Sequence, residues 1–277
     1  MTISQHKYIK EFLNKFDMAK CVPVSPPQIR GIELHAETDM SAQQIAAQKF
    51  DYRGLVGSRQ YLVRGTRPDI ANAVRELSKF LSCYNKTHWE AARRVLKYLN
   101  GTSTYGLLLD GKSRTVTYEV YTDASFACQP KERKSVTGYV ITMTGTSISW
   151  CISKQASVSL STAEAELIAL SEGAKESEWL WYLLREMGFP QENPVQVWCD
   201  SKSAISAVKN PGNHKATKHV HVPCLFTRDL VEEGRLDIRP TDDMAANILT
   251  KALPPTQFSK LREQIGVKDF KTTTGDT

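Results

Sequence analysis

The chain has 277 residues, of which 41% are hydrophobic and 24% are charged, and its formal net charge is +6. This balance is ordinary for a globular protein and argues against long disordered or fibrous regions. No apolar run reaches the roughly 18–20 residues of a membrane span, and the polar N-terminal segment lacks the apolar core of a signal peptide. The six cysteines form no CxxC pair, which indicates free thiols in a reducing compartment. We therefore expect an intracellular protein, in the cytoplasm or nucleus, that binds no membrane.

The first part of the chain, residues 1–112, is predicted to be mainly helical. Apolar residues recur at helical spacing over 69–81, and Pro68 suits the first turn of such a helix. A second helix is predicted over 87–99, whereas the stretch 22–46 is poor in core-forming residues and predicts a loop. The boundary with the next domain is expected near residues 110–113, which read DGKS.

The second part, residues 113–264, is predicted to be an α/β domain, and residues 265–277 a polar tail. The expected strands and helices alternate in the manner of a sheet flanked by helices. Their predicted order is a strand at 115–123, a hairpin of 138–144 and 147–153, a helix at 161–187, a strand at 195–200, a helix at 201–209, a strand at 236–239 and a helix at 244–253.

Basic residues are concentrated between residues 59 and 97, where we count nine Lys or Arg against three Asp or Glu. Aromatic residues lie among these charges. Basic clusters with interspersed aromatics suit a polyanion such as nucleic acid. The alternative is a solvated face of a helical hairpin.

Three acidic residues are placed where a shared cation could bind. Asp123 and Asp200 each end a predicted strand, and carboxylates at strand ends are well placed to share a metal ion. The alternative for each aspartate is a turn or a helix cap. In the long helix, Glu164 matches a capping box with Ser161, whereas Glu166 lies on a small, apolar face and needs a partner there. We therefore predict Glu164 as the cap and Glu166 as the ligand.

Other constellations are weaker. A zinc-binding module is one alternative, but the H-x4-H-x-H-x2-C spacing fits no closed structural site. Its candidate ligands are His214, His219, His221 and Cys224. The chain contains no GxSxG, GxxxxGK[ST] or GxGxxG motif, so hydrolase-elbow, NTPase and dinucleotide-binding functions lack support.

Several motifs, in this order, resemble the ribonuclease H domain of copia-type retrotransposon Pol polyproteins. They are YTDASFA, KSVTGYVITMTGTSISWCISKQ, SLSTAEAELIALSEGAKESEWL, VWCDSKSAI and ILTKALP. The earlier segments YRGLVGSRQYLVRGTRPDIANAVRELSKF and HWEAARRVLKYLNGTSTYGLLL resemble the reverse-transcriptase thumb and connection of the same polyprotein.

The resemblance implies a ribonuclease H-like fold, with a mixed five-stranded sheet and flanking helices, preceded by the helical thumb and connection segment. It implies hydrolysis of the RNA strand of an RNA–DNA hybrid with two Mg²⁺ or Mn²⁺ ions. Asp123, Glu166 and Asp200 would be catalytic metal ligands, and the basic segment would grip phosphates of the hybrid. The candidates for phosphate contact are Arg67, Arg75, Arg93, Arg94 and Lys97. The upstream polymerase portion is a further expected partner, and no small-molecule cofactor is expected.

Two departures from the family pattern bear on activity. The family's fourth metal ligand is an Asp, and this chain has Asn247 there; Asp243, one helical turn earlier, is an alternative ligand. In the segment KHVHVPC, His221 replaces an Asp, and Pro223 predicts a local departure from the family's helix. Two functions therefore stay open: a ribonuclease H weakened at its fourth ligand, or a non-catalytic protein with a nucleic-acid-binding or effector-like role. No polymerase activity is expected from this chain alone.

Overall fold

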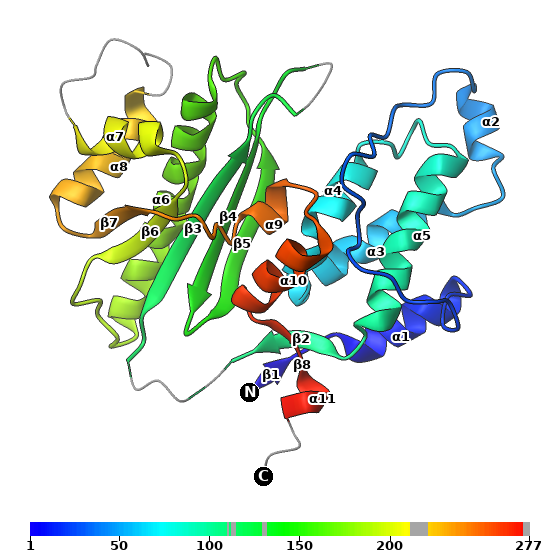
Figure 1. The fold of residues 1–277 in the computed structure, drawn as a ribbon, viewed down its shortest axis with the longest axis horizontal. Coiled ribbons are helices and arrows are strands. Elements are labelled where there is room, and N and C mark those ends of the chain that lie inside the picture. The colour runs from blue at the N-terminus through cyan, green and yellow to red at the C-terminus, as the bar shows by residue number, and fades with distance from the viewer. Residues whose placement is uncertain (110, 112–114, 129–131, 211–220, 274–277) are drawn as a thin grey trace. The chain divides into compact units, whose positions relative to one another are not determined.

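The structure, a computed structural model, describes residues 1–109, 111, 115–128, 132–210 and 221–273 (Figure 1). The chain forms two compact units, one made of residues 1–109 with 252–277 and the other of residues 110–251. In the described part of the chain, no helix combines the length and the apolar character needed to cross a membrane.

The first unit combines helices with a small antiparallel sheet of order β1-β2-β8. Its elements are β1 (Thr2–Ile3), α1 (His6–Lys15), α2 (Ala42–Ala46), α3 (Tyr52–Gly65), the 3-10 turn η1 (Pro68–Ile70), α4 (Ala71–Ser78), α5 (Lys86–Gly101), β2 (Tyr105–Leu108), α10 (Pro255–Gln264), β8 (Val267–Asp269) and α11 (Phe270–Thr273).

The predicted helix over 69–81 is shorter in the structure. Pro68 begins η1, at the first-turn position where its missing N–H removes no helical hydrogen bond. The following helix α4 ends at Ser78, so Leu81 lies beyond it with 37% of its surface exposed. The apolar stripe therefore continues past the helix into a turn.

Side-chain caps explain two helix starts in this unit. The predicted helix over 87–99 is confirmed as α5, and the Asn85 side chain accepts a hydrogen bond of 3.0 Å from the backbone N–H of Thr87. Within the predicted loop 22–46, the short helix α2 forms because Ser41 begins a capping box.

The structure does not follow the predicted boundaries of the C-terminal segments, which were an α/β domain over 113–264 and a polar tail over 265–277. Helix α10 belongs to the first unit, where the Phe258 and Tyr98 ring centroids lie 5.5 Å apart. Val267 is fully buried, and β8 pairs with β2. Because buried apolar side chains anchor this segment, the chain from α10 onward joins the first unit, and the expected tail is only partly polar.

The second unit contains the predicted α/β arrangement. Its elements are β3 (Tyr118–Ser125), β4 (Val136–Met143), β5 (Thr146–Lys154), α6 (Thr162–Glu186), β6 (Val195–Cys199), α7 (Lys202–Lys209), α8 (His221–Glu232), β7 (Leu236–Pro240) and α9 (Asn247–Thr250).

Five strands in the described part of this unit form one mixed sheet of order β5-β4-β3-β6-β7. Strand β4 is antiparallel to both β3 and β5, whereas β6 runs parallel to β3 and β7 parallel to β6. The hairpin between β4 and β5 turns at Thr144 and Gly145, whose φ angles of 50° and 77° suit a tight turn. The predicted mixed five-stranded sheet with flanking helices is confirmed.

Helices α6 and α9 cover opposite faces of this sheet (Figure 1). A Cβ on Gly173 of α6 would lie 2.5 Å from Cγ2 of Thr122 in β3, so the glycine permits close packing on that face. The next residue, Asp123, accepts a hydrogen bond from Thr250 of α9. Because consecutive strand residues point to opposite faces, the two helices lie on opposite sides of β3.

The hydrophobic core of this unit lies between the sheet and the helices α6, α7 and α8. It contains fully buried side chains from each layer, among them Val120, Ile141, Leu170, Val197, Ala204 and Ile238. Helix α8 forms despite Pro223, because this residue lies in the first turn, where a backbone N–H has no helical acceptor. The departure predicted from the proline is therefore wrong for the backbone.

Candidate active site

Asp123 lies in β3, where it is fully buried. It accepts a hydrogen bond from Thr250 Oγ1, and its Oδ1 lies 2.9 Å from the ammonium nitrogen of Lys251. Burial raises the pKa of the Asp123 carboxyl group, although Lys251 and Thr250 oppose this effect. Asp123 is thus neither a turn residue nor a helix cap, but a buried acid held by two residues at the end of α9.

A glycine explains why α9 comes so close to Asp123. Gly138 of β4 pairs directly with Asp123 in the sheet. A Cβ on Gly138 would lie 2.6 Å from Cγ2 of Thr250 and 3.2 Å from Cβ of Leu249. Any larger residue would push α9 away, so Gly138 permits the close packing of α9 against β4.

Glu166 projects from α6 and is 4% exposed. Its carboxylate accepts a hydrogen bond from the backbone N–H of Ala124, but its Oε2 is buried without a hydrogen-bond partner. Burial, followed by the charges of Asp123 and Asp200, raises the pKa of Glu166 to about 9. Glu164 turns back towards the helix start as predicted: Ser161 Oγ accepts a 3.2 Å hydrogen bond from the N–H of Glu164. The Glu164 carboxylate, however, accepts from the N–H of Leu160 at 2.7 Å, one residue before the cap, so the capping box is incomplete.

Asp200 follows β6 directly and is exposed. It is not the cap of the next helix, because the Ser201 side chain accepts the capping hydrogen bond from the N–H of Ala204 at 3.2 Å. Possible ligand atoms of Glu166, Cys199 and Asp200 all lie within 4.8 Å of one another. The structure therefore brings Glu166 and Asp200 together, and the charge of Asp123 acts on both the Glu166 and Lys251 side chains.

Cys199 was not predicted from the sequence as part of this site. Neighbouring residues of a strand point to opposite faces, so its position beside Asp200 argues against a shared site. The strand ends at Cys199, however, and the chain then turns, which lets both side chains approach Glu166. The thiol is fully buried, and burial raises its pKa to about 12.

Asn247 is the first residue of α9, and its Oδ1 lies 2.6 Å from Nζ of Lys251. Lys251 follows the helix, four residues later, and bridges Asn247 to Asp123. The spacing of four residues is the one signal in the sequence that could have linked Lys251 to Asn247. Asp243 lies in the turn before α9 and not in the helix, so its expected place one helical turn before Asn247 is wrong.

The donor atoms fit a divalent metal ion. Carboxylate and amide oxygens are ligands that hard cations prefer, and the buried Oε2 of Glu166 lacks a partner. A cation beside Asp123, Glu166 and Asp200 would also offset the repulsion that raises the pKa of Glu166.

The alternative zinc module receives no support from the residues that can be described. His214 and His219 lie outside the described residues, and so does the side chain of His221. Cys224 belongs to the hydrophobic core, and its thiol lies 3.8 Å from the carbonyl oxygen of Ala207.

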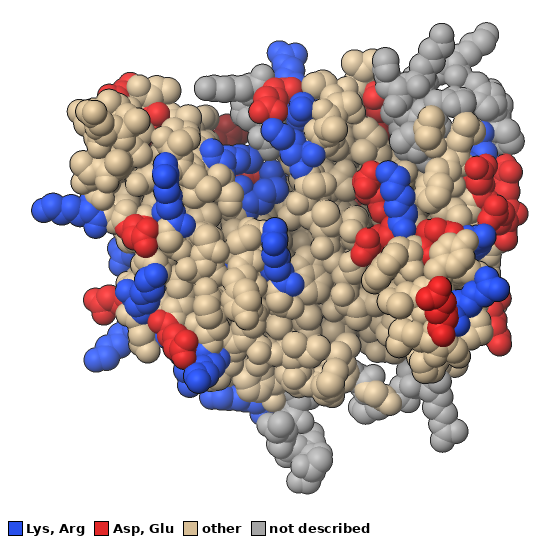
Figure 2. Space-filling view, turned by 180° about the vertical axis from the view of Figure 1, so that it is seen from behind, with Lys and Arg blue, Asp and Glu red and all other residues tan. Residues whose placement is uncertain are grey.

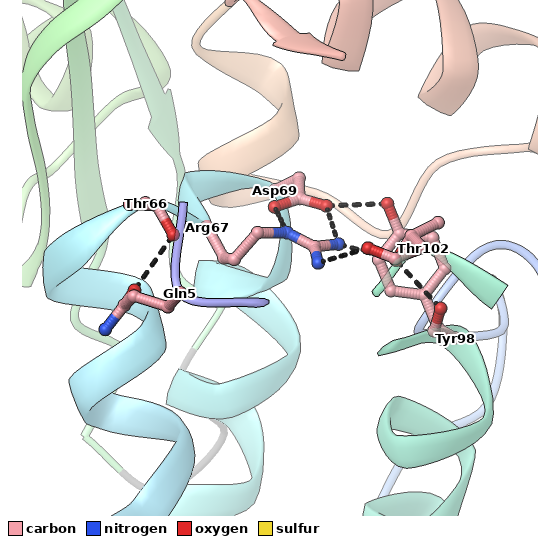
Figure 3. A network of polar contacts seen from close by, with 6 residues as sticks. All are labelled: Gln5, Thr66, Arg67, Asp69, Tyr98 and Thr102. Atoms are coloured by element: carbon pink, nitrogen blue, oxygen red, sulfur yellow. Dashed lines mark hydrogen bonds and ion pairs between the residues drawn. The ribbon is translucent and has the colours of Figure 1, made fainter. Parts of the chain in front are cut away.

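Arg67, predicted to contact phosphate, is fully buried in the first unit (Figure 3). Its Nε lies 2.9 Å from Asp69 Oδ1 and its Nη2 2.8 Å from Oδ2, and the guanidinium also donates to the carbonyl oxygen of Thr102 at 3.0 Å. Tyr98 donates a further 2.6 Å hydrogen bond to Asp69. The prediction for Arg67 is therefore wrong: an internal carboxylate occupies its donors, and no phosphate can reach it.

The other basic residues predicted to contact phosphate are partly exposed, but most of them already contact other groups of the protein. Arg75 contacts Glu76, Arg93 lies 3.3 Å from Glu90, and Arg94 donates to the carbonyl oxygen of Pro26 at 3.1 Å. Lys97 is half-buried. On the face of the described chain in Figure 2, both basic and acidic side chains occur, and much of the surface between them carries neither. The charge surplus of residues 59–97 thus does not translate directly into a phosphate-binding surface.

The strand order and the two parallel pairs beside an antiparallel hairpin are those of a ribonuclease H-like fold. Two solved structures are distantly similar to this chain, with TM-scores below 0.5. The N-terminal RNase H domain of rv2228c from Mycobacterium tuberculosis matches with a TM-score of 0.36 and 13% identity, over 54% of this chain and 98% of that chain. The foamy viral protease-reverse transcriptase in complex with RNA/DNA hybrid matches with a TM-score of 0.42 and 12% identity, over 84% and 27%.

Curated relatives identify the family, although no family model matches the chain. The chain is 39% identical over 270 residues to the retrovirus-related Pol polyprotein from transposon TNT 1-94 of Nicotiana tabacum, and 34% identical over 269 residues to that from transposon RE1 of Arabidopsis thaliana. Both alignments cover 96% of this chain but only 20% and 18% of the relatives, so the chain spans about a fifth of their length. The chain belongs to the family of retrovirus-related Pol polyproteins of copia-type transposons.

One shorter relative is named as an effector protein and not as a Pol polyprotein. Secreted RxLR effector protein 161 of Plasmopara viticola is 43% identical over 129 residues, which cover 47% of this chain and 90% of that protein.

Proposed function

We propose that residues 110–251 form a ribonuclease H-type nuclease that hydrolyses the RNA strand of RNA–DNA hybrids. The observation that carries the proposal is that Glu166 and Asp200 offer ligand atoms within 4.8 Å of each other, and that one buried carboxylate oxygen of Glu166 lacks a partner. The buried Asp123 lies near enough for its charge to raise the pKa of Glu166. Such an arrangement is costly without a cation, since like charges in a buried site repel one another. Membership of the Pol polyprotein family supports the same function.

In this proposal Asp123, Glu166 and Asp200 hold two Mg²⁺ or Mn²⁺ ions, with the amide oxygen of Asn247 at the fourth position. The bound ions would stabilise charge on the scissile phosphate and lower the pKa of the attacking water. Glu166 must lose a proton from its carboxyl group when it becomes a ligand, because its pKa in the metal-free site is about 9. Metal affinity should therefore increase as the pH rises towards about 9.

Asn247 would weaken the proposed site at its fourth ligand position. An amide oxygen can contact a metal ion but adds no negative charge, so the ion there is held by fewer charges than with a carboxylate. We therefore expect slow cleavage and a need for high metal concentrations. Mn²⁺ should support cleavage better than Mg²⁺, because Mg²⁺ gives up its waters more reluctantly.

The first unit, in the same proposal, is the thumb and connection portion of the polyprotein and contacts the hybrid. Arg67 is excluded from this role by its burial. Arg75, Arg93, Arg94 and Lys97 remain the proposed phosphate contacts, and each would have to exchange any present contact for a phosphate oxygen. The upstream polymerase portion remains a proposed partner.

The test is cleavage of a labelled RNA–DNA hybrid by the purified chain with Mg²⁺, with Mn²⁺ and with EDTA. Asp123→Asn should abolish cleavage, whereas the control Asp237→Asn, which changes an acid of β7 paired with Arg239, should not. Single-stranded RNA and double-stranded DNA of the same sequence should stay intact. Cleavage by Asp123→Asn at the wild-type rate would overturn the assignment of this residue.

A second candidate function is a non-catalytic, nucleic-acid-binding or effector-like role. Two observations favour it: Asn247 in place of a carboxylate, and the similarity to the protein named as a secreted effector. The same experiment separates the two functions. Tight hybrid binding with no cleavage at any metal concentration, by the wild type and by Asn247→Asp alike, would favour the non-catalytic role.

A further inference from the structure

Lys251 occupies the position where two of the proposed metal ligands meet. Its ammonium nitrogen lies 2.9 Å from Oδ1 of Asp123 and 2.6 Å from Oδ1 of Asn247. The Asp123 side chain is completely buried, whereas 40% of the Lys251 side chain is exposed. The ammonium group therefore reaches from the surface into the site.

The carboxyl groups of the site all act on this one ammonium group. Asp123, Asp200 and Glu166 all favour the charged form of Lys251 and outweigh the opposing effect of its burial, so the pKa of Lys251 is raised. The contacts of 2.9 Å and 2.6 Å place the ammonium group against two residues that the proposed function assigns to metal. In the metal-free protein it offsets part of their negative charge.

A lysine ammonium and a divalent ion cannot use the same oxygen atoms in the same way. Mg²⁺ binds oxygen at about 2.1 Å and requires the lone pairs of its ligands, which here point at the ammonium protons. The repulsion between the two cations would also be strong at this separation. Lys251 can leave without moving the backbone, because its side chain is long, flexible and partly exposed.

We propose that Lys251 is a tethered cation that holds Asp123 and Asn247 in the metal-free protein and is displaced when a divalent ion binds. The inference rests on the proposed function only in assigning metal to Asp123 and Asn247. It makes the lysine a competitor of the metal, so that metal occupies the site only above a threshold concentration set by this competition.

The first experiment measures Mn²⁺ binding by electron paramagnetic resonance of the free ion, without nucleic acid. Lys251→Met should lower the Kd for Mn²⁺ about tenfold, because a charge-assisted hydrogen bond no longer competes. Lys251→Arg keeps the positive charge and should retain the wild-type Kd within about threefold. The matched control is Lys154→Met, which removes a lysine of similar exposure that lies 2.8 Å from Glu132, and it should leave the Kd unchanged.

The second experiment uses the wild-type chain, so that it does not depend on the folding of a variant. Mild acetylation followed by mass spectrometry reports how accessible each lysine amine is. Acetylation of Lys251 should increase severalfold when Mg²⁺ or Mn²⁺ is added, while that of Lys154 stays constant.

The outcomes are distinct from those of the nuclease assay. An unchanged or higher Kd in Lys251→Met, or acetylation of Lys251 that does not respond to metal, overturns the competition even if the wild type cleaves hybrids. Tighter Mn²⁺ binding by Lys251→Met in a chain that cleaves no hybrid keeps the competition and overturns the nuclease. Absence of Mn²⁺ binding by every variant overturns both.

Discussion

The buried pair of Arg67 and Asp69 provides the sharpest test of how the basic segment works. Replacing Arg67 by Met removes both contacts to the Asp69 carboxylate, 2.8 and 2.9 Å long, and leaves that charge with the hydrogen bond from Tyr98 and the more distant charge of Arg262. Breaking a buried ion pair by removing one partner costs about 3–5 kcal/mol, because the remaining charge is uncompensated. We expect a loss of that size in the free energy of unfolding of the first unit.

The double variant Arg67→Met with Asp69→Asn should recover much of this loss, since no buried charge then remains without a partner. The matched control is Arg93→Met, because Arg93 forms an exposed pair with Glu90 in which the side chains are 38% and 49% exposed. Pairs of this kind contribute roughly 0–1 kcal/mol.

Unfolding in urea should be followed by hydrogen exchange of peptides from α5, because these peptides report on the first unit and not on the second. A loss below about 1 kcal/mol for Arg67→Met would refute the reasoning from burial. Weaker hybrid binding by Arg67→Met at unchanged stability would refute it equally, because a residue that only supports the fold cannot lower affinity in a fully folded protein.

Three further predictions concern the second unit. In EDTA, Glu166 favours the folded state below pH 4.5, its unfolded pKa, and this contribution is lost as the pH rises towards its folded pKa of about 9. The melting temperature should therefore fall over this pH range less steeply in Glu166→Gln than in the wild type. Equal slopes for the two proteins would contradict the raised pKa. Gly173→Ala should destabilise the second unit by about 1–3 kcal/mol in urea titrations, because the added Cβ meets Thr122. The control Gly57→Ala in α3 has open space at its Cβ, so it should be neutral or stabilise the first unit by up to about 1 kcal/mol. A stabilised Gly173→Ala would show that α6 does not pack as described. Asn247→Asp should raise the cleavage rate at limiting Mn²⁺ in steady-state assays, and a gain at saturating metal alone would show that this position does not control metal affinity.

Local features of the chain could be predicted from the sequence, because they depend on residues only a few positions apart. The start of α6 follows from Ser161 and Glu164, whose capping contacts span only a few positions. The hairpin turn follows from Gly145, which tolerates a positive φ. The placement of Glu166 on the inner face follows from helical periodicity, and the mixed sheet from the order of strands and helices together with the family motifs.

Contacts between distant residues were decided only by the tertiary structure. Arg67 is basic in any sequence count, yet it is internal because Asp69, Tyr98 and Thr102 gather around it. The membership of α10 and β8 in the first unit depends on pairing with β2, more than a hundred residues away in the chain. No local pattern encodes such pairings, because they depend on which buried surfaces meet after folding.

The site divides in the same way. Asp123, Glu166, Asp200 and Asn247 could be selected from strand ends, helix faces and family motifs, since each lies in a recognisable segment. Lys251 and Cys199 could not be assigned a place, because their roles depend on how α9 and the end of β6 approach the buried acids. Sequence determined which residues could carry charge and where helices and strands begin; packing decided which charges are buried, which are paired and which remain able to bind a metal ion.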